Sequence, residues 1–395
     1  MSISIYIHIP FCLKKCDYCD FKSTSPETIP EKEYTDCVIK EMRNITGTLY
    51  DERARVKSIY FGGGTPSLFG ADSIGRMLAA VDELYDIEKG AEVTLEVNPK
   101  TADYERLVAF KGAGINRLSI GTQSFDDNLL KIIGRVHSRD DSLTMYKNAR
   151  RAGFNNINLD LIFGIPTQTQ EMLYTDLNIL TELDPEHISA YILTVERATP
   201  LFDRIKSGTL RVDDDLVTKM FKSVEHRLSE RGYLHYEVSA YAKDGLRSVQ
   251  NSNYWRSGEY IGFGSAAHSM VKGSRATKLC ESVAATEAVG AVRWYNLGEY
   301  EEYMARVKAD GKGVKAAAVL SEQQRMTEFL IMGMRLLDGI RLDDFMDEFG
   351  VELTELYDDK ISALKNAKLI EIKNNLLKLT PKGVLLSNEV LLTLI

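Results

Sequence analysis

The feature that most constrains the fold is an alternation of β-like runs with amphipathic, helix-like stretches. Six runs rich in β-branched and apolar residues lie at 2–9, 56–61, 92–97, 116–121, 156–162 and 187–193. Helical periodicity fills the intervals, at 31–45, 73–85, 102–113, 140–152 and 170–183. This spacing predicts parallel βα units with right-handed crossovers. Six units are too few to close an eight-stranded barrel, so we expect an α/β fold with a partial (β/α)6 TIM-like barrel. A seventh run at 235–241 is expected to extend the sheet beyond its last parallel strand.

The C-terminal part of the chain has a different pattern. Helical periodicity at 322–337, 342–349 and 353–367 precedes two short apolar runs, 369–372 and 376–379, around Lys373-Asn374-Asn375. Three helices and a hairpin predict a C-terminal helical, winged-helix-like domain. The helix at 353–367 lacks a basic stripe, so we expect a packing or lid role rather than DNA reading. The predicted domains are the barrel at 1–245, a connecting region at 246–315 and the C-terminal domain at 316–395.

Composition narrows the class of protein. The chain has 395 residues, 44% of them hydrophobic and 27% charged, as in ordinary globular proteins. A net charge of −8 argues against a nucleic-acid partner and against binding of the whole chain to anionic membranes. No run approaches the ~18 apolar residues of a membrane span, and no signal peptide is visible. We therefore expect a soluble, cytoplasmic protein.

Three of the five cysteines, Cys12, Cys16 and Cys19, fall within eight residues after the first predicted strand. An odd number of cysteines without an export signal argues against a disulfide framework. Three thiolates on one tight loop suit a [4Fe–4S] cluster whose fourth iron stays open for a small ligand. The alternative, a zinc site, needs a fourth ligand, for which the candidates are His8, Cys37 and Cys280.

Glycines and polar residues gather where the other predicted strands end. They lie at 62–66 (GGGTP), 96–99, 121–123, 160 and 164–166. Because the carboxyl ends of parallel strands meet at one edge, these residues are expected to share a ligand. GGGTP lacks the GK[ST] of a phosphate-binding loop, so we do not expect a nucleoside triphosphate.

The cysteine spacing, CxxxCxYC, followed by GGGTP after the second strand resembles the radical S-adenosylmethionine (SAM) superfamily. Segments 6–21, 61–67, 95–99, 117–125, 159–169 and 251–255 are similar to the oxygen-independent coproporphyrinogen III oxidase group, over nearly the whole chain. The short N-terminus, and Phe21 where the oxidases carry an extra cysteine, resemble the HemW heme chaperone branch. The resemblance implies a [4Fe–4S] cluster and SAM, whose one-electron cleavage gives a 5′-deoxyadenosyl radical, together with heme.

The resemblance also implies roles for individual residues. Cys12, Cys16 and Cys19 would hold the cluster, and no catalytic residue is assigned. The SAM contacts would come from the amino-acid side (Gly63, Gly64, Thr65, Glu96), from the ribose and carboxylate side (Gln123, Arg135, Asp160), from tyrosines beside the cluster and adenine (Tyr6, Tyr18) and from a nucleoside wall (Ile162, Tyr191, Thr194).

Heme ligation is the point where this chain departs from the chaperone pattern. That branch typically has HNxxYW, whose histidine is a natural iron ligand, but this chain reads QNSNYW at 250–255. Glutamine is a poor axial ligand, which disfavours ligation of the heme iron at this position. The candidate heme or porphyrin residues are Gln250, Asn251, Tyr254, Trp255 and His268, with His235 and Cys280 as further candidate ligands.

Three functions remain open. The first is a HemW-like heme chaperone that binds the cluster, SAM and heme and passes heme to an acceptor protein. Its expected partners include an electron donor such as flavodoxin or ferredoxin, and it would contact a membrane heme protein peripherally. The second is an oxygen-independent coproporphyrinogen III oxidase or another porphyrin-modifying radical SAM enzyme, which Phe21 disfavours. The third is a zinc-stabilised regulatory module, which the acidic charge and the barrel pattern disfavour.

Overall fold

The computed structural model describes residues 2–50, 52–279 and 290–395, and its centre is a curved sheet. Within these residues the sheet has twelve strands in the order β12-β11-β10-β9-β1-β2-β3-β4-β5-β6-β8-β7. The six predicted strands are β1 (Ser2–Ile9), β2 (Arg55–Gly63), β3 (Asp86–Val97), β4 (Arg117–Gln123), β5 (Ile157–Phe163) and β6 (His187–Ile192). Neighbours in this series pair in parallel, and the sheet does not close, which confirms the predicted partial barrel.

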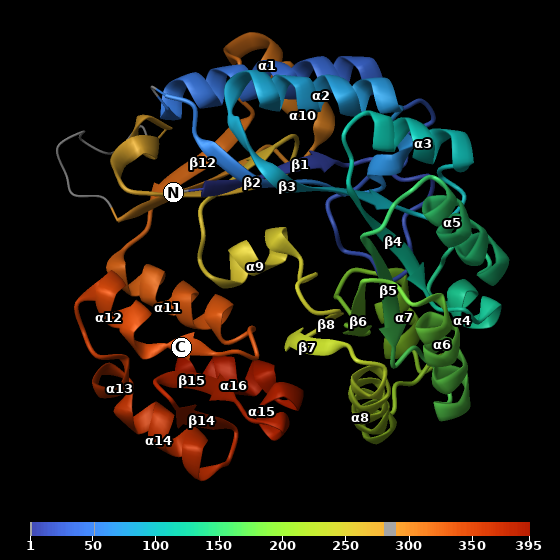
Figure 1. The fold of residues 1–395 in the computed structure, drawn as a ribbon, viewed down its shortest axis with the longest axis vertical. Coiled ribbons are helices and arrows are strands. Elements are labelled where there is room, and N and C mark those ends of the chain that lie inside the picture. The colour runs from blue at the N-terminus through green and yellow to red at the C-terminus, as the bar shows by residue number, and fades with distance from the viewer. Residues whose placement is uncertain (1, 51, 280–289) are drawn as a thin grey trace.

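Helices follow the parallel strands and cover the outer side of the sheet (Figure 1). They are α1 (Glu31–Leu49), α2 (Ala71–Leu84), α3 (Tyr104–Gly112), α4 (Asp127–Ile132), α5 (Arg139–Arg151) and α6 (Gln170–Leu183). In α1 the buried residues include Tyr34, Val38, Met42 and Ile45, spaced three or four apart on one face. Ser138 and Asp141 form a capping box that starts α5. The short 3-10 helix η1 (Pro66–Leu68) follows β2.

Beyond β6, the edge of the sheet is antiparallel. β8 (Ala240–Ala242) pairs with β6, and β7 (Leu234–Glu237) pairs with β8. The run predicted at 235–241 therefore extends the sheet, but as two short strands joined by a turn. Two helices, α7 (Pro200–Lys206) and α8 (Asp214–Glu230), lie between β6 and β7 in the chain.

The opposite edge carries four strands that the sequence did not predict. They are β9 (Tyr260–Phe263), β10 (His268–Lys272), β11 (Ala291–Asn296) and β12 (Val314–Val319). β9 pairs in parallel with β1, and β9 to β12 pair antiparallel with one another. We call β9–β12 the sheet extension. The same region holds α9 (Val249–Trp255), η2 (Ser274–Leu279) and α10 (Tyr300–Asp310).

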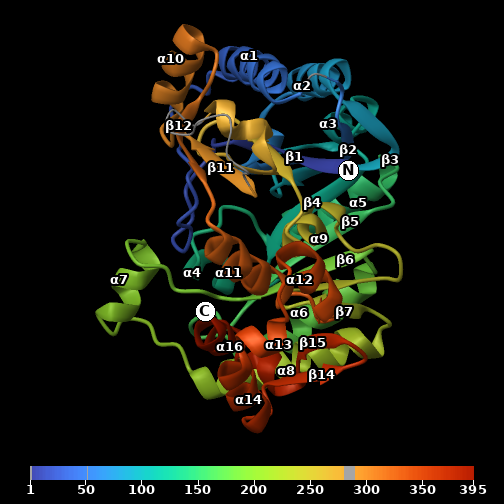
Figure 2. The same cartoon turned by 90° about the vertical axis from the view of Figure 1, so that its left-hand side faces the viewer.

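The C-terminal domain lies beside the open, inner side of the sheet (Figures 1 and 2). Its helices are α11 (Glu322–Gly333), α12 (Leu342–Phe349), α13 (Leu353–Leu356), α14 (Asp358–Asn366), α15 (Pro381–Leu385) and α16 (Ser387–Leu394). Its small sheet is β13 (Ile340–Arg341), β15 (Leu376–Leu379) and β14 (Ile370–Lys373). The predicted hairpin is present, with Asn374 and Asn375 at positive φ in the turn.

The C-terminal prediction needs one correction. The helix expected at 353–367 is broken at Tyr357, whose φ of −117° is not helical, and so forms α13 and α14. The predicted helices at 322–337 and 342–349 correspond to α11 and α12. In the part of the chain that the structure describes, no helix combines the length and the hydropathy that crossing a bilayer requires.

Candidate functional site

The loop after β1 brings three thiols to one cavity. Cys12, Cys16 and Cys19 line a cavity of about 450 Å³ at the carboxyl ends of the parallel strands. None of the three forms a disulfide. Thr65 Oγ1 donates to Cys12 Sγ at 3.7 Å, and Arg135 Nη1 donates to Cys16 Sγ at 3.5 Å. Burial raises the pKa of Cys12 and of Cys19, so a positive partner such as iron is needed to hold these thiols as thiolates.

The spacing of the thiols bears on the choice between a cluster and a single ion. Among the described residues, no three His, Cys, Asp or Glu side chains converge closely enough to hold one metal ion. In a [4Fe–4S] cluster each cysteine binds a different iron, so the thiolates surround the cluster instead of meeting at a point. Three thiols on one loop match the donor set of such a cluster, whereas a structural zinc site takes four ligands.

The glycine loop after β2 packs directly on the cysteine loop. Gly64 N donates to Ile9 O at 2.9 Å, and Thr65 N donates to Phe11 O at 2.7 Å. A Cβ at Gly64 would lie 2.6 Å from Phe11 O. Gly63 has φ of +119°, and its Cβ would lie 2.6 Å from the ring of His8. Gly64 is required because its backbone passes too close to that of Phe11 for any side chain, and Gly63 because of its positive φ and the nearby ring of His8.

Two half-buried carboxyl groups form the other end of this cavity. Tyr60 OH donates to Glu96 Oε1 at 2.8 Å, and Gly63 N donates to Glu96 Oε2 at 3.2 Å. Burial, aided by the charge of Asp160, raises the pKa of Glu96 to about 7. Burial also raises the pKa of Asp160 to about 6, although Asn158 donates to it at 2.7 Å. Such acceptors suit the ammonium and hydroxyl groups of a polar ligand.

The cavity collects nearly all of the residues that the sequence assigned to SAM. Those that line it are Tyr18, Gly63, Gly64, Thr65, Glu96, Gln123, Arg135, Asp160, Ile162, Tyr191 and Thr194. Tyr6 lines a neighbouring cavity instead.

The sequence-based assignment missed Asn98, the polar residue before Pro99 at the end of β3. Asn98 Nδ2 donates to Thr65 Oγ1 at 2.9 Å, and Asn98 Oδ1 accepts from Arg135 Nη2 at 2.5 Å. The same Nη2 donates to Gly121 O at 2.8 Å, so the guanidinium of Arg135 joins the cysteine loop to two strand ends. The only available signal was the position of this asparagine among the polar strand ends.

A second cavity, of about 560 Å³, lies between the sheet extension and the C-terminal domain. It shares Phe21, Gly63 and Glu96 with the first cavity, so the two cavities adjoin. We call it the apolar cavity, because much of its wall is apolar: Tyr254, Trp255, Tyr260, Ala266, Met270, Ala291, Leu320, Phe329, Met332 and Phe349. The motif at 250–255 pointed to Tyr254 and Trp255, but no pattern in the sequence pointed to the rest of this wall, because β10, β11, α11 and α12 meet only in the folded chain.

Charged side chains on the wall of the apolar cavity link the two domains. Arg293 of β11 pairs with Glu328 of α11, with N···O distances of 2.5 and 2.8 Å. Lys272 of β10 pairs with Glu348 of α12 at 3.0 Å, and Arg325 of α11 pairs with the same carboxylate. Three cations thus share two carboxylates. The buried Nε of Arg293 and Nε1 of Trp255 have no hydrogen-bond partner among the described residues.

Not all of the predicted heme residues reach the apolar cavity. Tyr254, Trp255 and His268 line it, whereas Gln250 and Asn251 do not. His235 lines neither cavity and stacks on Tyr241 with ring centroids 4.1 Å apart. Cys280 lies outside the described residues.

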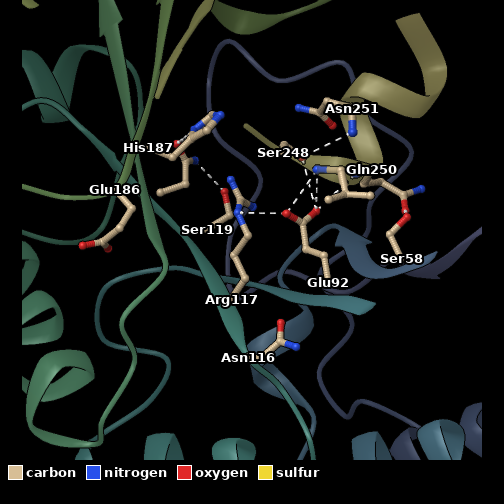
Figure 3. A network of polar contacts seen from close by, with 12 residues as sticks. Ser58, Glu92, Asn116, Arg117, Ser119, Glu186, His187, Ser248, Gln250 and Asn251 are labelled. Carbon is tan, nitrogen blue, oxygen red and sulfur yellow. Dashed lines mark hydrogen bonds and ion pairs between the residues drawn. The ribbon is translucent and has the colours of Figure 1, made fainter. Parts of the chain in front are cut away.

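Gln250 is held in a buried polar network instead (Figure 3). Its side chain is 1% exposed, its Oε1 accepts from Ser58 Oγ at 2.8 Å, and its Nε2 donates to Tyr254 OH at 2.7 Å. Glu92 of β3 accepts from the backbone N–H of Val249 and of Gln250, at 3.1 and 3.2 Å. This network fixes the start of α9 against the sheet and leaves the amide of Gln250 without a free oxygen or nitrogen directed at the cavity.

The two histidines of the apolar cavity differ in their partners. His8 Nε2 donates to Lys22 O at 3.0 Å, so Nδ1 accepts from Tyr6 OH, also at 3.0 Å. Burial lowers the pKa of His8 to about 4. His268 stacks on Tyr295, with ring centroids 5.3 Å apart and planes 19° apart. Burial and then the charge of Arg293 lower the pKa of His268, which favours a neutral imidazole.

Two family profiles match the chain: that of the Radical SAM superfamily over residues 6–180, and that of the HemN C-terminal domain over residues 320–386. The fold and the cysteine loop therefore define a radical SAM protein, and proteins of this superfamily bind a [4Fe–4S] cluster and SAM. The heme chaperone HemW of Bacillus subtilis is 32% identical over 98% of this chain and 97% of its own length. HemW of Haemophilus influenzae is 33% identical, with the same coverage. The chain belongs to the HemW family.

Other comparisons agree with this placement. The bovine radical S-adenosyl methionine domain-containing protein 1, mitochondrial, is 33% identical over 99% of this chain and 87% of its own length. Among solved structures, coproporphyrinogen III oxidase (HemN) from Escherichia coli superposes with a TM-score of 0.82. That match covers 100% of this chain and 90% of the oxidase at 20% identity, and so shows a shared fold.

Proposed function

We propose that this protein is a HemW-like heme chaperone that binds a [4Fe–4S] cluster, SAM and heme and transfers heme to an acceptor protein. The observation that carries the proposal is the apolar cavity of about 560 Å³ that adjoins the cysteine cavity. Its volume lies in the range of small-molecule sites, and its aromatic and aliphatic wall suits a flat apolar macrocycle. Relatives that match over nearly the full chain are named heme chaperones.

The proposed cofactor contacts follow from the first cavity. Cys12, Cys16 and Cys19 hold the cluster, which supplies one-electron chemistry to bound SAM. Glu96 and Asp160 accept hydrogen bonds from the ammonium and hydroxyl groups of SAM, and Gln123 lies beside them. Arg135 neutralises charge on the cysteine loop, which its contact with Cys16 supports. Tyr18, Ile162, Tyr191 and Thr194 form the nucleoside side.

The partners and location expected from the sequence stay predictions. They are a heme-acceptor protein, an electron donor such as flavodoxin or ferredoxin, a peripheral contact with a membrane heme protein, and the cytoplasm. The division into 1–245, 246–315 and 316–395 stays a prediction as well.

A second function, oxidation of coproporphyrinogen III or another porphyrin modification, is favoured by one observation. Phe21, Gly63 and Glu96 line both cavities, so a porphyrin in the apolar cavity would lie next to bound SAM. The oxidase shares this fold. Phe21, in place of a cysteine, still disfavours this alternative.

One anaerobic experiment separates the two functions. The protein is reconstituted with iron and sulfide, then given either ferric heme or coproporphyrinogen III with SAM and a reductant. A chaperone is expected to take up about one heme per chain, seen as a shifted Soret band, and to release no carbon dioxide. Cluster-loaded protein that takes up no heme would overturn the proposal, and substrate-dependent 5′-deoxyadenosine with carbon dioxide would establish the oxidase.

The cluster assignment has its own test. Cys16→Ala is expected to lose the cluster, because one iron then lacks its thiolate and two cysteines hold the remainder weakly. Cys37→Ala is the control, since Cys37 is buried in α1 and lines neither cavity. Iron and acid-labile sulfide per chain are measured after anaerobic reconstitution. A full cluster in Cys16→Ala would show that the ligand set is wrong.

A further inference from the structure

We propose that His268 is the axial ligand of the heme iron in the apolar cavity, and that position 250 does not ligate iron in this protein. This inference rests on the proposed function and specifies its site. The ligand class is an iron tetrapyrrole with an apolar ring and an acidic edge. Four observations support it. They are the hydrogen bonds of Gln250, the partners of the other histidines, the exposed position of His268 on β10, and the cationic side chains further along the same wall.

Position 250 is removed from the cavity by the fold. Both polar atoms of the Gln250 amide are used, one by Ser58 and the other by Tyr254. The backbone of α9 at this point is fixed by Glu92, which pairs with the buried Arg117 (Figure 3). Turning the side chain into the cavity would leave the hydroxyl groups of Ser58 and Tyr254 without these hydrogen bonds, which disfavours such a rotation.

The other histidines either have both ring nitrogens hydrogen-bonded or lie away from the apolar cavity. The chain has six, and the structure describes all of them. His8 reaches the cavity, but both of its ring nitrogens are hydrogen-bonded. The remaining four lie away from the cavity: His137 bonded to Thr122, His187 bonded to Asn158 and Tyr236, His226 on the surface of α8, and His235 stacked on Tyr241.

His268 has the setting that an iron ligand needs. It starts β10 with an exposed side chain, and neither of its ring nitrogens hydrogen-bonds to another described residue. Its ring is oriented by the stack on Tyr295, its antiparallel partner on β11. Because side chains alternate along a strand, His268, Met270 and Lys272 share one face of β10, and all three line the cavity.

Charge along the same wall matches an acidic edge. His268 and Lys272 are four positions apart, which places their Cα atoms about 13 Å apart along an extended strand. Lys272 and Arg325 both pair with Glu348, and Arg293 on the same wall pairs with Glu328, so these three cations meet two carboxylates in these ion pairs. The buried Nε of Arg293 has no partner among the described residues. Carboxylates at the ring edge would take this surplus charge while the iron lies over the imidazole.

The experiment compares the cluster-loaded wild type, His268→Ala and His226→Ala. His226 is a matched control, because its side chain is 75% exposed on α8, far from the cavity wall. Each protein is titrated with ferric heme, followed by the Soret band and by electron paramagnetic resonance. Each is also titrated with metal-free protoporphyrin IX, followed by fluorescence. Circular dichroism and iron content check that every variant is folded and loaded.

The expected result is specific to a bond with iron. His268→Ala weakens heme binding about tenfold or more and changes the resonance spectrum, because an axial nitrogen is lost. It binds metal-free protoporphyrin like the wild type, since that ring has no iron to ligate. In His268→Gly, free imidazole restores the wild-type spectrum. His226→Ala behaves like the wild type in every titration.

The outcomes separate this inference from the proposed function. If the wild-type protein takes up no heme, both the ligand assignment and the proposed chaperone function are wrong. Wild-type uptake with an unchanged spectrum in His268→Ala overturns the ligand assignment and leaves the chaperone role standing. Equal losses for heme and for metal-free protoporphyrin also overturn it, because they show that His268 is only part of the wall.

Discussion

Glu41 shows how one buried carboxyl group can tie the sheet extension to the barrel. It lies on α1, is 1% exposed and accepts from Gly264 N and Tyr303 OH at 2.9 and 2.7 Å. It also accepts from Asn296 Nδ2 at 2.8 Å and from Gly313 N at 3.1 Å. These donors come from four separate stretches of the chain between 264 and 313. A single side chain therefore joins α1 to β11, to α10 and to the segments after β9 and before β12.

This carboxyl group predicts a pH effect on stability. Burial raises the pKa of Glu41 from 4.5 to about 7, so the folded state binds its proton more tightly than the unfolded chain does. The stabilising contribution of protonated Glu41 to the free energy of unfolding is fully present below pH 4.5, and it is lost as the pH rises through about 7. We expect the unfolding free energy to fall between pH 5 and pH 8 by on the order of 3 kcal/mol more in the wild type than in Glu41→Gln.

Urea unfolding at several pH values, followed by tryptophan fluorescence, checks this prediction. Trp294 is a suitable reporter because it is buried in β11, within the sheet extension. Tyr34, Cys37 and Tyr303 are the titratable groups beside Glu41, and burial raises the pKa of each. Their raised values leave them neutral over this range. If the unfolding free energy depends on pH in the same way in the wild type and in Glu41→Gln, the titration of Glu41 does not cause the effect.

At the scale of elements, α9 depends on contacts made far from it in sequence. Glu92 of β3 accepts from the first N–H groups of this helix and pairs with Arg117 of β4 at 3.6 Å. Ser248 caps the same helix by accepting from Asn251 N. A seven-residue helix is too short to be stable alone, so this anchor decides where Tyr254 and Trp255 lie.

Removing the carboxylate of Glu92 is expected to lower the free energy of unfolding substantially. Glu92→Ala leaves Arg117, which is 2% exposed, as a buried unpaired charge, with an expected loss of about 3–5 kcal/mol. Glu83→Ala is the control, because its pair with Arg43 is exposed and is worth about 1 kcal/mol or less. Urea denaturation of both variants checks the difference. Equal, small losses in the two variants would mean that the network does not hold α9.

At the scale of the whole molecule, the apolar cavity exists because two domains face each other. The sheet extension supplies Lys272 and Arg293, whereas the C-terminal domain supplies Arg325, Glu328 and Glu348. Of these ion pairs, Lys272 with Glu348 and Arg293 with Glu328 cross the interface between the domains. Access to the cavity is therefore coupled to how firmly the C-terminal domain is held.

Glu348→Gln tests this coupling, because it weakens the contact with Lys272 across the interface and the contact with Arg325 beside it. We expect the interface to lose about 2 kcal/mol, and backbone amides of α11 and α12 to exchange hydrogen faster, while β1–β6 keep their protection. Asp343→Asn is the control, since its pair with Arg341 is exposed and lies within the C-terminal domain. Hydrogen exchange followed by mass spectrometry measures both variants. Unchanged exchange in α11 and α12 of Glu348→Gln would contradict this coupling.

The sequence by itself determined the parallel βα series, the cysteine loop and most of the residues that line the first cavity. Local patterns sufficed for the strands and for the polar strand ends, because each helix follows its strand directly and the carboxyl ends of parallel strands meet at one edge. Other residues of the cavity, such as Arg135 and Tyr191, came from the resemblance to the radical SAM superfamily. Cys12, Thr65, Glu96 and Asp160 are far apart in the chain, yet strand order alone places them together. The hairpin around Asn374 and Asn375 was predictable for a similar reason, since its turn chemistry is local.

Only the tertiary structure decided the apolar cavity and the residues that face it. The strands β9–β12 are short, and the alternation of apolar and polar residues within each of them is weak. Periodicity in the sequence therefore did not predict them. Packing separates the residues of the motif at 250–255. Gln250 lies in a polar network with Ser58 and Glu92, whereas Tyr254 and Trp255 line the apolar cavity. The cations of that wall meet carboxylates from another domain, and contacts between separate domains leave no local signature in a sequence.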